Sequence, residues 1–533
     1  MAAETYIATQ NETAALPRRF LLPIYLLLSV AALLPLALVD LPALVDYPNH
    51  LARLHILANI SADEALAANY QVVWAAMPNL AMDIVSWPFL GLLPVETLGL
   101  LFIVLTMALV VAGTLALHRA LHGSIGLWPA AAWLFLYNHL LIMGFLNYLF
   151  AVGLALLLFA GWIASEGRPA WIRLALFPAA LIGVYFAHLF ALGVYGVCVA
   201  GFELSRVWGD LRADWKVAVR NRLVVAWQFI PVGLLVLATM PGGGERSFYY
   251  GPLLQKIKAL WSPALTYLKP IDLGVFLFAA AILIAGLATR KLVLARAMRL
   301  PMILFILLAA AMPFQMEGAW GHIWYADLRL PIVIVLLLVA GLRPRNVGPK
   351  ATMVVISAAL VLFAGRIYDI SGEWRRVDRD FAEFRTALSV IEPGAALLPV
   401  QKQNVPLPDG ATRFDHAYWH MPVMAVVDRS AFVPTLFTDP AKQPVRVTEA
   451  RAAMDTEFGA PIDLALLVDS AHGRGAVAGG VGMKPFWVDW PVRYDYVLIT
   501  HFGAKGNPLP NLLAPVHEGA FFDIYRVATP GES

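Results

Sequence analysis

The chain has 533 residues, of which 60% are hydrophobic and only 14% are charged. A soluble domain carries about 25% charged residues, so the composition excludes an ordinary water-soluble protein and indicates a membrane protein. The net charge of +3 does not indicate a nucleic-acid-binding protein, and a single cysteine, Cys198, excludes an intrachain disulfide or a cysteine-based metal site.

Residues 1–17 are polar and lack the basic start of a signal peptide, so we interpret the apolar run that follows Arg18 and Arg19 as a retained first span. Apolar runs of roughly 17–25 residues predict about eleven transmembrane helices in total. Their expected positions are 20–39, 96–117, 126–144, 146–164, 172–188, 189–205, 223–240, 272–289, 301–315, 328–342 and 351–366.

Basic residues predict the orientation of these spans, because cytoplasmic loops are enriched in Lys and Arg. With the N-terminus in the cytoplasm, the even-numbered connections are cytoplasmic, and nearly all are basic. They are 118–123, 165–173, 206–222, 289–299 and 342–350. The outer loop 241–271, with four Lys or Arg residues, is the exception. For a bacterial source, the membrane is the inner (plasma) membrane and the outer side is the periplasm.

Two outer segments, 40–95 and 241–271, are unusually long. The first is too polar to cross lipid, and part of it is expected to lie flat on the membrane as an amphipathic helix. The residues that share its apolar face are Leu51, Leu54, Leu57 and Ala58. Aromatic residues of the second segment suit the headgroup layer.

The composition changes after Arg366. We therefore predict a membrane domain over residues 1–366 and a C-terminal α/β extracytoplasmic domain over 367–533. Its expected helix lies at 377–391, and its expected strands are 395–401, 424–430, 462–468, 494–502 and 521–527.

The segment VDYPNHLAR of the first outer loop places Asp46 and His50 four residues apart, which is one face of a helix. Pro48 favours a helix start there. A carboxylate and an imidazole beside the membrane indicate a candidate site. The alternative is that Asp46 only caps a surface helix and His50 is solvated.

A second carboxylate, Asp83, precedes the second span among apolar residues. A charge at membrane depth is costly and hints at function, although solvation at the interface is the alternative.

A third candidate group, in MEGAWGHIWYADLRLP, precedes the tenth span. Arg329 suits bidentate recognition of a phosphate, with His322 nearby. The alternative is a structural ion pair between Arg329 and Asp327 or Glu317.

Two further polar groups have mainly structural interpretations. Between the third and fourth spans, four side chains are expected to hydrogen-bond across helices: Asn138, His139, Asn147 and Tyr148. In the terminal region, Asp415, His416 and His420 have the spacing of metal ligands, but a surface loop is the alternative.

This layout resembles the GT-C superfamily of membrane glycosyltransferases. The resemblance rests on VDYPNHLAR in a long first outer loop, PNLAMDIVSWPFL at the second span, Arg-Leu-Pro at a late outer helix start, and YDYVLI and FFDIYRV in a terminal domain. The Asp-Asp and Glu-x-Lys-Pro-Pro elements of the better-known branches are not evident.

The resemblance implies transfer of a sugar from a polyprenyl-phosphate donor to a glycan, lipid or protein acceptor at the outer face. Asp46 would then be the general base or would help to hold a divalent metal ion. Arg329 and His322 would bind the donor phosphate, and His50 and Asp83 would bind metal or acceptor. The competing classes are a transporter or lipid flippase, which would favour internal repeats and ionisable residues within paired helices, and a non-catalytic assembly protein.

Overall fold

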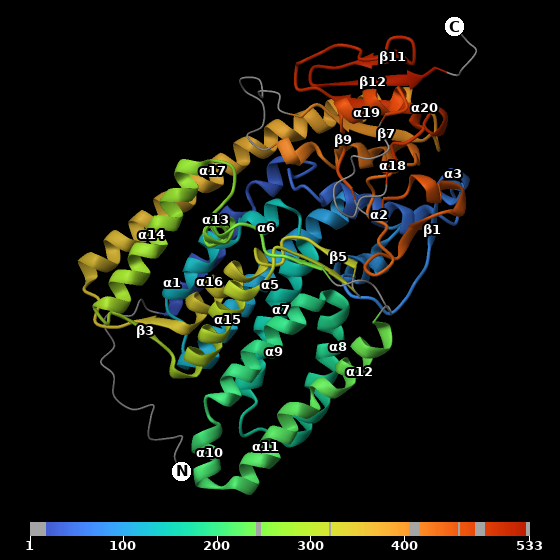
Figure 1. Ribbon diagram of the computed structural model, residues 1–533. Helices are drawn as coiled ribbons and strands as arrows, with labels where there is room; N and C mark the ends of the chain where they lie inside the picture. The colour runs from blue at the N-terminus through green and yellow to red at the C-terminus, as the bar shows by residue number, and fades with distance from the viewer. Residues whose placement is uncertain are drawn as a thin grey trace.

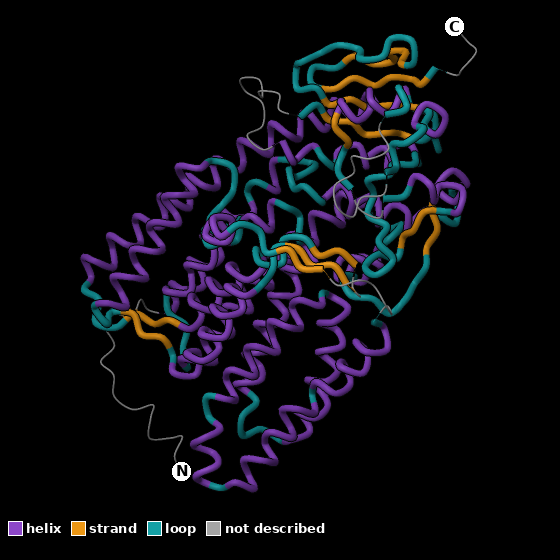
Figure 2. Tube along the Cα trace, viewed as in Figure 1, coloured by secondary structure: helices purple, strands orange, loops and turns teal. Residues whose placement is uncertain are grey.

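The computed structural model describes residues 18–240, 247–318, 321–403, 415–456, 459–474 and 485–528. Apolar helices form a bundle, and a smaller region of sheet and short helices lies at one end of it (Figures 1 and 2). The main bundle helices are α1 (Arg18–Leu33), α5 (Val95–His122), α7 (Leu146–Ala164), α8 (Phe177–Ala187), α9 (Leu189–Leu204), α11 (Trp215–Trp227), α12 (Phe229–Thr239), α14 (Lys269–Ala288), α15 (Arg299–Ala311), α16 (Arg329–Gly341) and α17 (Pro349–Ala387).

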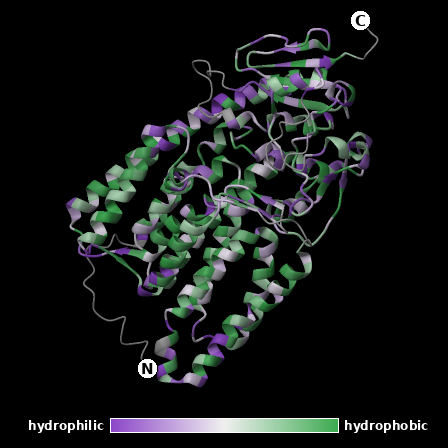
Figure 3. Ribbon diagram, viewed as in Figure 1, coloured by the Kyte–Doolittle hydropathy of each residue, from purple (hydrophilic) through white to green (hydrophobic). Residues whose placement is uncertain are grey.

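Hydrophobic residues predominate along most of these helices, as the hydropathy colouring of the ribbon in Figure 3 shows. Five helical stretches of the described chain are long and apolar enough to cross a membrane: Val95–His122, Leu146–Ala164, Trp215–Thr239, Lys269–Ala288 and Pro349–Val390. The protein is therefore membrane-associated, whereas the total of about eleven spans stays a prediction.

The predicted third span, 126–144, is not one regular helix. It consists of a 3₁₀ helix, Trp128–Phe135, and the short helix α6 (His139–Ile142). Asn138 separates the two, because its backbone is extended and its side-chain oxygen accepts hydrogen bonds from the backbone N–H groups of Leu140 and Leu141.

Connections predicted to be cytoplasmic contact one another at one end of the bundle. His118 of α5 lies 2.9 Å from the carbonyl oxygen of Ala340 at the end of α16. The strand β3 (Leu292–Leu294) pairs with β6 (Leu342–Pro344). These contacts are consistent with the predicted alternation of the spans.

Helix α17 runs through the predicted domain boundary at residue 366. Its first half exposes apolar side chains such as Val354 and Val361, while in its second half Trp374 and Phe384 are buried. One 39-residue helix thus connects the bundle to the terminal region.

The terminal region contains a five-stranded sheet in the order β11-β12-β10-β7-β9. The strands are β7 (Leu397–Gln401), β9 (Ile462–Asp463), β10 (Tyr496–Thr500), β11 (Leu513–Glu518) and β12 (Phe522–Val527). β7 lies parallel to β9 and β10, and β12 is antiparallel to β10 and β11. The expected strands at 395–401, 494–502 and 521–527 are confirmed within a few residues.

Two expected strands are wrong. Residues 424–430 form a helix, α18 (Met424–Arg429), which ends at Ser430 with a positive φ of 53°. Most of 462–468 belongs to α19 (Leu464–Ala471), because the Asp463 side chain accepts the N–H of Ala465 and starts a helix. Short apolar runs of this kind fit either state by pattern alone.

The first outer loop folds into α2 (Tyr47–Asn59), α3 (Glu64–Asn69) and α4 (Ala81–Ser86). Between α3 and α4, β1 (Tyr70–Val72) pairs with β8 (Val445–Val447) of the terminal region. The expectation that the apolar face of α2 rests on lipid is wrong for two of its four residues, whereas Leu57 and Ala58 stay partly exposed. Leu51 and Leu54 are fully buried, because α5 and α18 pack against α2.

Candidate functional site

Asp46 is the N-cap residue that directly precedes α2, yet its side chain makes no capping hydrogen bond. Its backbone N–H donates to the carbonyl of Met143 at 3.2 Å, and the neighbouring Gly144 has a φ of 84°. Burial raises the pKa of Asp46 to about 8, although the positive charge of Arg329 lowers it. Asp46 therefore has the position of a helix cap, as the alternative interpretation expects, but its carboxyl group does not form the capping hydrogen bond.

Arg329 begins α16 and is surrounded by aromatic rings. Its guanidinium carbon lies 4.8 Å from the ring centre of Phe145, 5.5 Å from that of Tyr148 and 4.9 Å from that of Phe190. The Tyr148 hydroxyl donates to the backbone carbonyl of Arg329 at 2.6 Å. Nη1 lies 3.1 Å from Nε2 of His188. These contacts fix the guanidinium at the end of the bundle.

The carboxylates proposed as structural partners of Arg329 have other partners. Asp327 lies 3.7 Å from Lys256 Nζ, and Glu317 lies 2.8 Å from Nε2 of His322. The guanidinium instead donates to the carbonyl of Trp324 at 3.3 Å. The charge of Arg329 is thus not neutralised by Asp327 or Glu317, and Asp46 is a carboxyl group whose pKa responds to it.

The turn at Gly144 and Phe145 connects Asp46 to Arg329. Gly144 contacts the backbone of Asp46 so closely that a Cβ atom on it would lie 2.7 Å from the Asp46 nitrogen. The next residue, Phe145, stacks on Arg329 and lies 6.3 Å, centre to centre, from the ring of Tyr325. Burial raises the pKa of Tyr325, and the negative charge of Asp46 raises it further. These side chains form one cluster, which we call the Asp46–Arg329 site.

His50 and Asp83 belong to a buried network around Arg53. Arg53 donates from Nε to Asp83 at 2.6 Å and from Nη1 to Gln443 at 2.6 Å. His50 places Nε2 3.2 Å from the Gly144 carbonyl and Nδ1 3.2 Å from Arg53 Nη2. A carbonyl can only accept, so Nε2 carries the hydrogen and Nδ1 accepts. Burial and Arg53 lower the pKa of His50 to about 3. For either residue, binding metal or acceptor would require breaking these contacts.

His322 lies on β5 (Gly321–Ile323), where its carbonyl accepts from Lys442 and its ring faces Glu317. The side chain that faces the Arg329 guanidinium is His188. Asn147 and Tyr148, expected to bond across helices, do so: Asn147 accepts the backbone N–H of Met82 in α4 at 2.9 Å, and Tyr148 donates to the carbonyl of Arg329 in α16.

The sequence analysis does not predict His188 as a site residue and assigns His420 mainly to a surface loop. His188 lies where two apolar runs meet at the predicted outer end of the fifth and sixth spans, and this position is the only feature of the sequence that could have identified it. The sequence favours a surface loop for His420, but this residue is 4% exposed and its Nε2 lies 3.7 Å from the Asp46 carboxyl. In the part of the chain that the structure describes, no group of three His, Cys, Asp or Glu residues is arranged to hold a metal ion.

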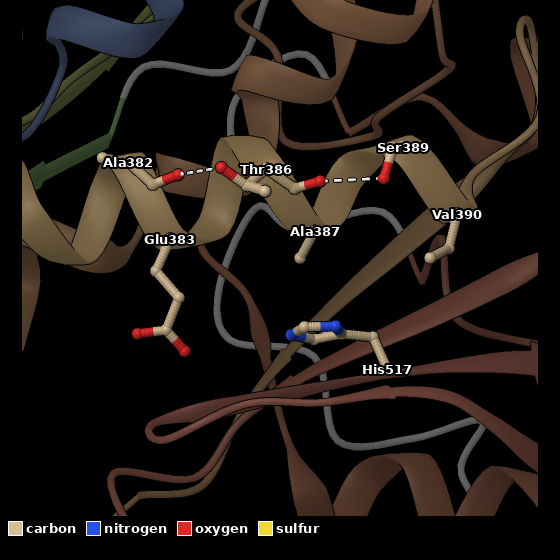
Figure 4. Close-up of a pocket in the computed structure, with 7 residues that line it drawn as sticks. All are labelled: Ala382, Glu383, Thr386, Ala387, Ser389, Val390 and His517. Carbon is tan, nitrogen blue, oxygen red and sulfur yellow. Dashed lines mark hydrogen bonds between the residues drawn. The ribbon is translucent and has the colours of Figure 1, made fainter.

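A surface hollow lies apart from this cluster, between the end of α17 and β11 (Figure 4). Glu383 and His517 point into it, and Thr386 and Ser389 donate their hydroxyls to carbonyls of α17. None of its lining residues belongs to the Asp46–Arg329 site.

Comparisons with models of protein families, with curated proteins and with solved structures found no match to this chain. A functional proposal for the protein therefore rests on the geometry of the Asp46–Arg329 site.

Proposed function

We propose that the protein is a glycosyltransferase that moves a sugar from a polyprenyl-phosphate donor to a hydroxyl acceptor at the outer face of a bacterial inner membrane. The observation that carries this proposal is the Asp46–Arg329 site. There, the turn at Gly144 and Phe145 brings an acid of the first outer loop close to a guanidinium at the start of a late helix, because Gly144 packs on Asp46 and Phe145 lies under Arg329.

The two groups match the two charges that develop during transfer. The acceptor oxygen forms a bond to the anomeric carbon and loses its proton to the Asp46 carboxylate. The bond between that carbon and the phosphate oxygen breaks, and the leaving phosphate carries the negative charge that Arg329 would stabilise. The low-polarity surroundings of Arg329 strengthen this stabilisation.

The site also suits a lipid-linked donor by its place in the bundle. Arg329 begins an apolar helix and Asp46 directly precedes α2, a helix outside the spans, so a headgroup emerging from the membrane would meet both. The resemblance to GT-C enzymes assigns the same two roles. In this proposal the N-terminus is cytoplasmic and the terminal region periplasmic.

The test is transfer of a labelled sugar from a polyprenyl-phosphate donor by purified protein in vesicles. Asp46→Asn keeps the size and removes the base, so the rate should fall about 10²–10⁴-fold. Arg329→Ala should raise the donor concentration needed for half-saturation as well as lower turnover. Asp63→Asn is the matched control, because Asp63 is an acid of the same loop that caps α3 and accepts from Ser430.

The outcomes separate this proposal from its rivals. A transporter or flippase would move the labelled lipid across the vesicle membrane without making a new glycosidic bond. Transfer at the parental rate by Asp46→Asn protein would show that Asp46 is not the base.

A further inference from the structure

His420 reaches the Asp46–Arg329 site from the terminal region. It precedes the short 3₁₀ helix Met421–Val423, which packs against α2. Its Nε2 lies 3.7 Å from Asp46 Oδ1, and Phe437 packs edge-on at 5.0 Å between ring centres. Met421 and Val423 are fully buried, so the imidazole is held in place by the core.

We propose that His420 is a positioning residue for Asp46, whose carboxylate it orients toward the acceptor by donating a hydrogen bond from Nε2. This inference rests on the proposed function. The distance of 3.7 Å is longer than a hydrogen bond, and catalytic hydrogen bonds of this kind commonly shorten when substrate binds.

Asp46 and His420 each have a polar group that the rest of the described fold does not use. Asp46 does not use its carboxyl group to cap α2. Among the described residues, His420 Nδ1 has no hydrogen-bond partner, so packing alone would be served better by an apolar side chain. Burial lowers the pKa of His420 to about 3, so the ring is neutral and one of its nitrogens carries a hydrogen.

The other titratable groups near Asp46 and His420 do not replace His420 as a hydrogen-bond donor to Asp46. Arg329 favours the ionised form of Asp46, and Tyr325 is a buried phenol whose pKa the Asp46 charge raises. His420 contributes to lowering the pKa of His50, but His50 is neutral and hydrogen-bonded to the Gly144 carbonyl and to Arg53. In the reaction, the proton leaves the acceptor hydroxyl and stays on Asp46, while His420 keeps its own proton throughout.

The test is the pH profile of transfer for His420→Ala and His420→Gln. Losing a donor to a carboxylate should move the midpoint for ionisation of Asp46 upward by about one pH unit, which lowers the rate about tenfold at neutral pH. His420→Gln retains an N–H donor, so it should recover most of the parental profile. The Michaelis constant for the donor should change little in either variant.

His501→Gln is the matched control, because His501 faces Asp523 at 3.3 Å in the same terminal region and is similarly buried. This variant should keep the parental midpoint. An unchanged midpoint in His420→Ala protein, or the same change in His501→Gln protein, would overturn the inference.

Infrared spectroscopy separates this inference from the proposed function. The carboxylic-acid band that Asp46→Asn abolishes reports the ionisation of Asp46 in protein without substrate. If the parental protein transfers no sugar but this band titrates higher in His420→Ala protein, the pair stands and the proposed function fails. If transfer occurs and neither the band nor the rate profile responds to His420, the function stands and the inference is wrong.

Discussion

Arg53 and Asp83 form an ion pair of 2.6 Å in which both side chains are almost completely buried. The same guanidinium binds Gln443 of the terminal region. Three segments that are distant in the sequence therefore share one charged contact.

The first prediction follows from the cost of an unpaired buried charge. Asp83→Ala leaves Arg53 without its carboxylate and should lower the free energy of unfolding by about 3–5 kcal/mol. Arg53→Met combined with Asp83→Leu should recover much of this loss. Equilibrium denaturation in mixed micelles measures both. Full stability of the single variant would show that Asp83 is not held by Arg53.

The second prediction concerns the pH dependence of transfer. Because burial raises the pKa of Asp46 to about 8, the proposed base is mostly protonated at neutral pH. The single-turnover rate should rise about tenfold per pH unit up to about pH 8 and then level off. A rate that is already level at pH 6 would contradict a proposed base whose pKa is raised to about 8.

The third prediction concerns stability, and its sign is opposite to that of an ordinary salt-bridged acid. Folded Asp46 keeps its proton up to about pH 8, whereas the unfolded chain loses it near pH 4. The folded state binds the extra proton in this range, so stability falls as pH rises through it. Asp46→Asn cannot ionise and should be more stable than the parent above about pH 8. Thermal unfolding across this range would measure the difference.

The fourth prediction tests the close approach at Gly144. A Cβ atom there would lie 2.7 Å from the Asp46 nitrogen and 2.8 Å from its Cβ, so Gly144→Ala should displace Asp46 and reduce transfer at least tenfold. Gly167 has a similar φ of 76°, but a Cβ atom on it would meet nothing within 4 Å. Gly167→Ala should therefore show only the backbone cost of about 1–2 kcal/mol and keep its activity.

The fifth prediction tests the sidedness of the membrane. Gln71 faces Arg446 across β1 and β8, and Val293 faces Arg343 across β3 and β6. In a Cys198→Ala background, cysteines at the first pair should form a disulfide in cells, because the periplasm is oxidising. Cysteines at the second pair should stay reduced in the cytoplasm. Alkylation followed by gel mobility distinguishes the two, and the reverse pattern would invert the orientation.

The sequence identifies individual residues of the site better than it identifies the residues with which they interact. Charge beside apolar runs identifies Asp46 and Arg329, and this signal is contained in a few neighbouring residues. Arg53 and His420 carry no such signal, because their roles come from contacts with Asp83 and Asp46 that only the fold creates. The wrong prediction of a strand at 424–430 has the same origin. The sequence of α18 has no pattern that distinguishes helix from strand, and its helical state is consistent with its packing against α2.

The pairing of Arg53 with Gln443, 390 residues later in the chain, has a consequence for biogenesis. At a synthesis rate of about 5–20 residues per second, roughly 20–80 seconds separate the two ends of this contact. During that time Arg53 and its carboxylate partner Asp83 have been made, but Gln443 and the helix α18 that packs against α2 have not. A chaperone on the side where this loop emerges would find the face of α2 that α18 covers still exposed, and a chain truncated before residue 420 would present that face permanently.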